Sequence, residues 1–281
     1  MSKALIGVLP FYLELYDLRL PEVRPRVEKF AHQIASEVAS RGFDVFLAPV
    51  CRLKEEFGNA VDRFDGEGVD AILTLHLAYS PSLESAEILG RTRTPIVVLD
   101  TSPSFAFGPD QDAGQIMFNH GIHGVQDLCN MLVRLGKPFL IEAGHWERSD
   151  VLDRIAGDLR QAAMASAMAK AKVGLIGEPF KGMGDFHVPA DELKQAIGIE
   201  VLKVAVEKVA EFLDQVSEDE IEREMCEDSS HFELVDLQPE LHRSTAQACL
   251  ALRKWLSNNG ASSLSMNVRS FSKAADQPTV R

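Results

Sequence analysis

The stretch Ala4-Leu5-Ile6-Gly7-Val8-Leu9, followed by Pro10, is a short apolar run of the kind that forms a buried β-strand. The next patterned segment, residues 23–41, repeats apolar side chains every three or four positions, which is the period of an amphipathic α-helix. Gly42 is suited to end that helix, and Asp44 opens a second short apolar run. A strand, a helix and another strand in this order predict a parallel sheet with helices packed on it.

The same alternation continues along the chain. Further strands are predicted over residues 44–48, 71–75, 96–99 and 138–143 and, after a run rich in Ala, Met and Lys, over residues 172–176, 200–205 and 263–268. The later helices are predicted over residues 150–169, 190–197, 206–215, 218–226 and 239–258. We therefore expect an α/β protein with two Rossmann-like parallel-sheet domains, residues 1–171 and residues 172–281.

Composition narrows the possible partners of the chain. Its 281 residues are 46% hydrophobic and carry a net charge of -13, with no run of Lys or Arg to bind nucleic-acid phosphates. The first apolar run is too short for a signal peptide or a membrane span, so no membrane partner is expected. The cysteines lack the spacing of a zinc finger or a disulfide framework. These features favour a cytoplasmic protein.

Two segments interrupt the apolar pattern with imidazoles, hydroxyls and glycines. They are Leu75-His76-Leu77-Ala78-Tyr79-Ser80-Pro81 and Met117-Phe118-Asn119-His120-Gly121-Ile122-His123-Gly124. This mixture packs poorly in a core but suits a concave site for a polyhydroxylated ligand, so a sugar is the expected small-molecule partner. An alternative interpretation is that His120 and His123 are surface residues at the start of a helix.

The position of the first segment, directly after a predicted strand, supports a site, because ligands of open parallel sheets bind beyond the carboxyl ends of the strands. Each predicted strand end is followed by aromatic, hydroxyl, carboxyl or imidazole groups: Phe11, Tyr12 and Tyr16; His76, Tyr79 and Ser80; Asp100 and Thr101; His145 and Trp146. For Phe11 and Trp146, packing beneath a loop is the more ordinary role.

No local motif supplies a complete catalytic or metal site. The glycine-rich stretch 177–185 lacks both the GxGxxG and the GK[ST] spacing, which argues against a nucleotide-dependent oxidoreductase. The acidic block between Glu218 and Asp228 is spread around a helix and is predicted to be solvated surface. We therefore predict no catalytic residue and no metal ligand from local motifs within this chain.

Four blocks in order resemble the L-arabinose isomerase and L-fucose isomerase superfamily, and most closely the arabinose isomerase arrangement. They are Leu75-His76 with Tyr79-Ser80-Pro81, Asn119-His120 with His123-Gly124, Gly144-His145-Trp146, and the stretch 173–185. The resemblance spans nearly the whole chain. It implies a Rossmann-like N-terminal domain, a central α/β domain and a C-terminal β-rich domain, assembled as trimers and hexamers with active sites at subunit interfaces.

The same resemblance implies aldose–ketose isomerisation through an enediol, with Mn²⁺ or another divalent cation held by two glutamates and two histidines. In the family the first glutamate follows the segments matched here by residues 263–268 and Pro278. The chain reaches Arg281 before that position. We therefore expect the N-terminal part of such an isomerase, without the β-rich domain and metal ligands and inactive as it stands. A stand-alone sugar-binding or regulatory protein of the same fold is the alternative.

The resemblance also assigns candidate substrate contacts. His120 stands where arabinose isomerases usually have Gln, Tyr79 where they have Phe, and Leu13 where Gln is usual. The positions that match substrate-contact residues of the family are Leu15, Tyr16, Tyr79, His120, His123, Met183 and Val268.

Overall fold

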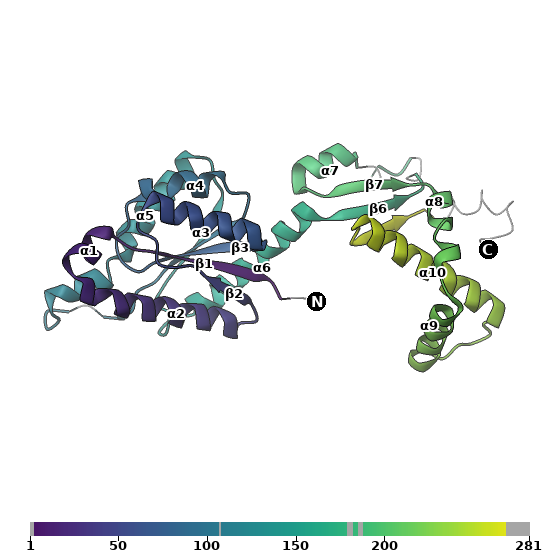
Figure 1. Ribbon diagram of the computed structural model, residues 1–281, viewed down its shortest axis with the longest axis horizontal. Helices are drawn as coiled ribbons and strands as arrows, with labels where there is room; N and C mark the ends of the chain where they lie inside the picture. Colours follow the sequence, from purple (N-terminus) through teal and green to yellow (C-terminus); the bar gives the residue numbers. More distant parts are fainter. Residues whose placement is uncertain (1–2, 107, 179–181, 185–187, 268–281) are drawn as a thin grey trace. The chain divides into compact units, whose positions relative to one another are not determined.

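The computed structural model describes residues 3–106, 108–178, 182–184 and 188–267 of an α/β protein with two parallel sheets, which confirms the predicted fold class (Figure 1). The chain divides into two compact units, Met1–Ala167 (unit 1) and Met168–Arg281 (unit 2). Helix α6, Val151–Lys170, contains the point of division, and the division expected after residue 171 falls just past its end.

Unit 1 is built on a five-stranded sheet with the order β2-β1-β3-β4-β5, in which every neighbouring pair is parallel. The strands are β1 Leu5–Phe11, β2 Asp44–Leu47, β3 Ala71–His76, β4 Ile96–Asp100 and β5 Phe139–Ala143. Strand β2 pairs with one side of β1, and β3, β4 and β5 follow in order on the other side. The order therefore reverses between β1 and β3, which is where open α/β sheets form ligand crevices.

Helices cover both faces of this sheet, as Figure 1 shows. Helix α2, Arg24–Ser40, and the first half of α6 pack on one face, and α3, Lys54–Glu67, α4, Ala86–Arg91, and α5, Gly121–Arg134, pack on the other. Shorter elements join them: α1 Glu14–Arg19 and the 3₁₀ turns η1 Pro21–Val23, η2 Ser82–Glu84 and η3 Ala113–Phe118. The two apolar layers hold the carboxyl edge of the sheet in place.

Strand β1 runs past the point at which the sequence predicted its end. Pro10 lies inside the strand although it has no N–H group to donate. Its carbonyl oxygen accepts a 2.9 Å hydrogen bond from the backbone N–H of Cys51, and Tyr12 N–H donates to the Cys51 carbonyl at the same distance. The segment after β2 therefore continues the pairing, and Pro10 does not break the strand.

Unit 2 contains a smaller parallel sheet of order β7-β6-β8, with strands β6 Lys172–Ile176, β7 Glu200–Val204 and β8 Ser263–Met266. Its helices are α7 Ala190–Ile197, α8 Val206–Ala210, α9 Glu218–His231 and α10 Pro239–Asn259. The prediction of a single helix over residues 206–215 is wrong. The α-helix ends with α8, and the chain then forms the 3₁₀ turn η5, Leu213–Gln215. Phe212, between these elements, packs against both apolar clusters of the unit.

The acidic helix α9 is longer than predicted and is not simply solvated surface. Glu220 accepts a 2.8 Å hydrogen bond from Lys254 of α10, and Glu224 pairs with Arg253 at 2.7 Å. Part of the acidic block therefore holds α9 against α10. In the described part of the chain, no helix is both long and apolar enough to cross a bilayer.

Candidate functional site at the carboxyl edge of the first sheet

The carboxyl edge of the unit 1 sheet brings together the two polar segments found in the sequence. His76 ends β3, and its ring stacks on Phe11 at the end of β1, with centroids 4.4 Å apart. The first turn of α5 covers the same residue. A Cβ on Gly121 would lie 2.6 Å from the His76 carbonyl oxygen, and one on Gly124 would lie 2.7 Å from the His76 Cδ2. The glycines of the second segment therefore allow α5 to approach the end of β3.

His76 is a buried, neutral imidazole. It is 3% exposed, and neither ring nitrogen has a hydrogen-bond partner. Burial lowers the pKa of His76 from 6.5 to about 3, because the charged form would lose its hydration without gaining a compensating partner. The hydroxyl of Ser80, in the turn that follows, is likewise buried and without a partner.

Three of the predicted contact residues, Tyr79, His120 and His123, form an aromatic group. The rings of His120 and His123 lie 4.6 Å apart, and Tyr79 stacks on His120 at 5.9 Å. Burial, and then the neighbouring His123, lower the pKa of His120, whose buried Nδ1 has no partner. His120 and His123 do lie at the start of α5, as the alternative interpretation held. His123 is exposed there, whereas His120 is half-buried.

The remaining predicted contacts on unit 1, Leu15 and Tyr16, lie on α1, directly after β1. Tyr16 packs edge-on against Tyr12 with ring centroids 5.9 Å apart, whereas Leu15 is 51% exposed. Tyr12 itself is fully buried and its hydroxyl has no partner. Burial, followed by the nearby negative charge of Asp17, raises the pKa of Tyr12 to about 12, so the hydroxyl stays protonated.

The ends of β4 and β5 add further polar groups. Burial raises the pKa of Asp100, the last residue of β4. The Thr101 hydroxyl accepts a 3.0 Å hydrogen bond from the Trp146 backbone N–H. His145 Nδ1 accepts hydrogen bonds from two backbone N–H groups at 3.1 Å, which requires the proton to be on Nε2. That buried Nε2–H and the indole N–H of Trp146 are donors without partners.

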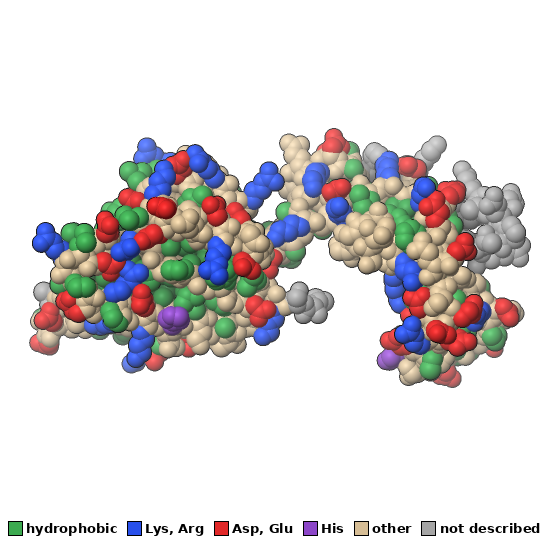
Figure 2. Space-filling view, viewed as in Figure 1, with side chains coloured by type: hydrophobic (Ala, Val, Ile, Leu, Met, Phe, Trp, Pro, Cys, Tyr) green, Lys and Arg blue, Asp and Glu red, His purple; other side chains and the backbone are tan. Residues whose placement is uncertain are grey.

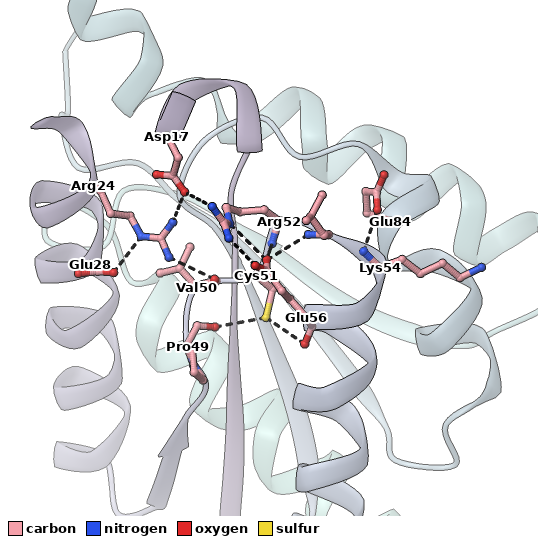
Figure 3. Close-up of polar contacts among 11 residues, drawn as sticks. Asp17, Arg24, Glu28, Pro49, Val50, Cys51, Arg52, Lys54, Glu56 and Glu84 are labelled. Carbon is pink, nitrogen blue, oxygen red and sulfur yellow. Dashed lines mark hydrogen bonds and ion pairs between the residues drawn. The ribbon is translucent and has the colours of Figure 1, made fainter. Parts of the chain in front are cut away.

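A cluster of charged residues beside this site was missed by the sequence reasoning. Figure 3 shows Asp17 of α1 between Arg24 of α2 and Arg52 of the segment after β2. Arg52 also pairs with Glu56 of α3 at 2.5 Å. Burial alone would raise the pKa of Glu56, but hydrogen bonds from Arg52 and Leu53 hold that pKa below its usual value. No local motif marks this cluster. The rule that post-strand segments meet at one edge could have brought Asp17, after β1, and Arg52, after β2, together.

The other two predicted contacts belong to unit 2. Met183 is 47% exposed, and Val268 lies outside the described residues. The donor set does not fit the divalent cation that the family resemblance implies for the full-length protein, because such a cation favours carboxylate and carbonyl oxygens in octahedral geometry. In the part of the chain that the structure describes, no three His, Cys, Asp or Glu side chains are grouped to hold a metal ion.

The arrangement can donate and accept neutral hydrogen bonds, and it offers aromatic faces. On the face of unit 1 drawn in Figure 2, acidic and basic side chains are interspersed. In comparisons with known proteins, neither a protein-family model nor a curated protein matches the chain.

Proposed function

We propose that the carboxyl edge of the unit 1 sheet binds a sugar, and that the chain is the recognition part of a sugar isomerase of the arabinose/fucose type. One observation carries this proposal. Among the described residues, the buried side-chain polar atoms without partners belong, apart from the Thr74 hydroxyl, to segments at this edge: Tyr12, His76, Ser80, His120, His145 and Trp146. Unpaired buried polar groups are costly, and a polyhydroxylated ligand supplies both donors and acceptors to neutral partners.

The chemistry of the site favours a neutral ligand over an anionic one. The lowered pKa values of His76 and His120 keep both imidazoles uncharged at neutral pH, so each offers one donor and one acceptor. Aromatic rings such as those of Tyr79 and His120 can pack against the apolar face of a sugar. In this proposal these residues bind and orient the substrate, and no proton-transfer step is assigned to them.

We also propose a homo-oligomer, a trimer or a hexamer, in which this edge faces a neighbouring subunit. The support is a set of exposed large apolar side chains on the segments that surround the site: Leu15, Leu18, Leu83, Phe105, Ile116 and Ile122. Sedimentation analysis of the purified chain tests this proposal. A cytoplasmic location is proposed with it, supported by cysteines that are all free.

The proposed sugar site is tested by titrating the purified chain with L-arabinose and with L-fucose. Binding is measured by calorimetry and by the NMR signals of the histidine rings. We expect saturable binding that His120→Ala or His123→Ala weakens by about tenfold, the effect of losing one polar contact with the ligand. The matched control is His32→Ala, which removes an exposed histidine from α2. Absence of binding by the unchanged protein, or equal effects of all three substitutions, would contradict the proposal.

Two further measurements examine the predicted lack of metal and of turnover in this chain. Calorimetric titration with Mn²⁺ is expected to show no stoichiometric tight site, and the chain with Mn²⁺ is expected to form no ketose from these aldoses. A one-to-one isotherm that is lost in His120→Ala or His123→Ala would instead place a metal at the aromatic group.

A further inference from the structure

Helix α1 is held in place by very little apolar packing. It has only six residues, none of which is buried, and Leu15 and Leu18 are 51% and 71% exposed. A helix of this length is not stable by itself, so contacts with the rest of unit 1 must determine where it lies.

The strongest of these contacts is the carboxylate of Asp17. Its Oδ2 accepts a 2.5 Å hydrogen bond from Arg24 Nη1 and a 2.7 Å hydrogen bond from Arg52 Nη1. The side chain of Asp17 is 16% exposed, and those of Arg24 and Arg52 are 23% and 26% exposed, so water screens these pairs less than it screens surface pairs. One carboxylate thereby joins α1 to α2 and to the segment after β2 (Figure 3).

Both arginines are themselves fixed by other partners. Arg24 donates to Glu28 at 2.8 Å and to the Val50 carbonyl at 3.3 Å, and Arg52 donates to Glu56 at 2.5 Å. Three carboxylates therefore surround two guanidinium groups. This excess of negative charge does not favour an external anion, so the cluster is suited to hold the protein's own backbone rather than a phosphate or carboxylate ligand.

The cluster also touches the uncharged part of the site. Tyr16, the residue before Asp17, packs on the ring of Tyr12, and the guanidinium carbon of Arg24 lies 5.6 Å from the centroid of that ring. We infer that Asp17 is a positioning residue: by bridging Arg24 and Arg52 it fixes α1, and with it both Leu15 and the Tyr16 ring that packs on Tyr12 in the ligand site. This inference rests on the proposed sugar site.

The test compares Asp17→Asn with Glu28→Gln, which removes a different carboxylate from the same arginine without altering α1. Hydrogen exchange of the α1 amides and affinity for L-arabinose and L-fucose are measured for the full chain. In Asp17→Asn we expect α1 amides to exchange about tenfold faster and sugar affinity to fall about tenfold, whereas Glu28→Gln changes neither. Arg52→Gln, which leaves Asp17 paired with Arg24, should show the same pattern to a smaller extent and serves if Asp17→Asn fails to fold.

The outcomes separate this inference from the proposed function. If the unchanged chain binds neither sugar, the proposed function is wrong, and so is the role of Asp17 in the ligand site. If the unchanged chain binds sugar but Asp17→Asn binds it equally well, or exchanges its α1 amides at the original rate, the positioning role alone is wrong. Equal losses in Glu28→Gln would also overturn it, because they would show a general effect of disturbing Arg24.

Discussion

The carboxyl edge of the first sheet has two halves that treat polar groups in opposite ways. Beside β1 and β2, Asp17, Arg24, Arg52 and Glu56 are charged and bonded to one another. Beside β3 and α5, His76, Ser80 and His120 are neutral and carry buried atoms without partners. The charged side chains of the first half are paired and stabilise the fold, and the Tyr12 hydroxyl is the exception there, whereas the second half retains several unpaired groups. Polar residues at a strand end therefore indicate a ligand site only where the protein does not already pair them.

At neutral pH, the largest effect of a substitution is expected where α5 meets β3. In Gly121→Ala the new methyl group would lie 2.6 Å from the His76 carbonyl oxygen, and backbone cannot move aside cheaply. We expect a loss of about 2 kcal/mol in the free energy of unfolding, measured by urea denaturation. The control is Gly58→Ala in α3, where nothing lies within 4 Å of the new atom and helix propensity should raise stability by about 0.5–1 kcal/mol. Equal effects of the two substitutions would show that α5 is not closely packed on His76.

The second prediction uses the buried imidazole of the neutral half. The unfolded chain takes up a proton on His76 below pH 6.5, whereas the folded chain resists protonation until about pH 3. The stability due to neutral His76 is therefore fully present above pH 6.5 and is lost as the pH falls toward 3, by up to about 1.4 kcal/mol per pH unit. Urea unfolding at pH 7, 6 and 5 should show a steeper decline for the unchanged protein than for His76→Phe. Parallel pH profiles would show that His76 can be protonated in the folded state.

The third prediction concerns the charged half. Glu56→Gln removes the negative charge and replaces one of the two oxygens that accept hydrogen bonds from the Arg52 side chain and from the backbone N–H groups of Arg52 and Leu53. Because the side chain is partly exposed, we expect a moderate loss of about 1–2 kcal/mol at neutral pH. The comparison is the stability of Glu84→Gln, since in the described part of the chain Glu84 accepts a hydrogen bond from one backbone N–H, that of Lys54. An unchanged stability of Glu56→Gln would contradict the view that this half holds the edge together.

The smallest effect on stability is expected from Tyr12→Phe. The substitution removes a buried hydroxyl that has no partner, so no hydrogen bond is lost. We expect stability to stay the same or to rise by about 0.5 kcal/mol, while affinity for L-arabinose or L-fucose falls. A clear loss of stability would contradict this prediction, because it would show that the hydroxyl is already satisfied within the protein.

The sequence by itself determined the elements and the residue types at the site. Apolar runs and helical periods are local properties, so the strands at 71–76, 96–100 and 172–176 and the long helices follow from them. The same reasoning brought His76, Tyr79 and Trp146 to one sheet edge, because parallel strands end together. It did not predict that Pro10 stays within β1 or that the chain tightens after α8, since partners distant in sequence decide both.

Only the tertiary structure decided which polar groups are paired. Asp17 and Arg52 are separated by 35 positions, and only the strand order places them on one carboxylate oxygen. The roles of Gly121 and Gly124 likewise become visible only when α5 lies on His76. The physical reason is the same in both cases. Hydrogen bonding and burial depend on distances between segments, which a local pattern does not contain, whereas the tendency to form a strand or a helix depends on neighbours along the chain.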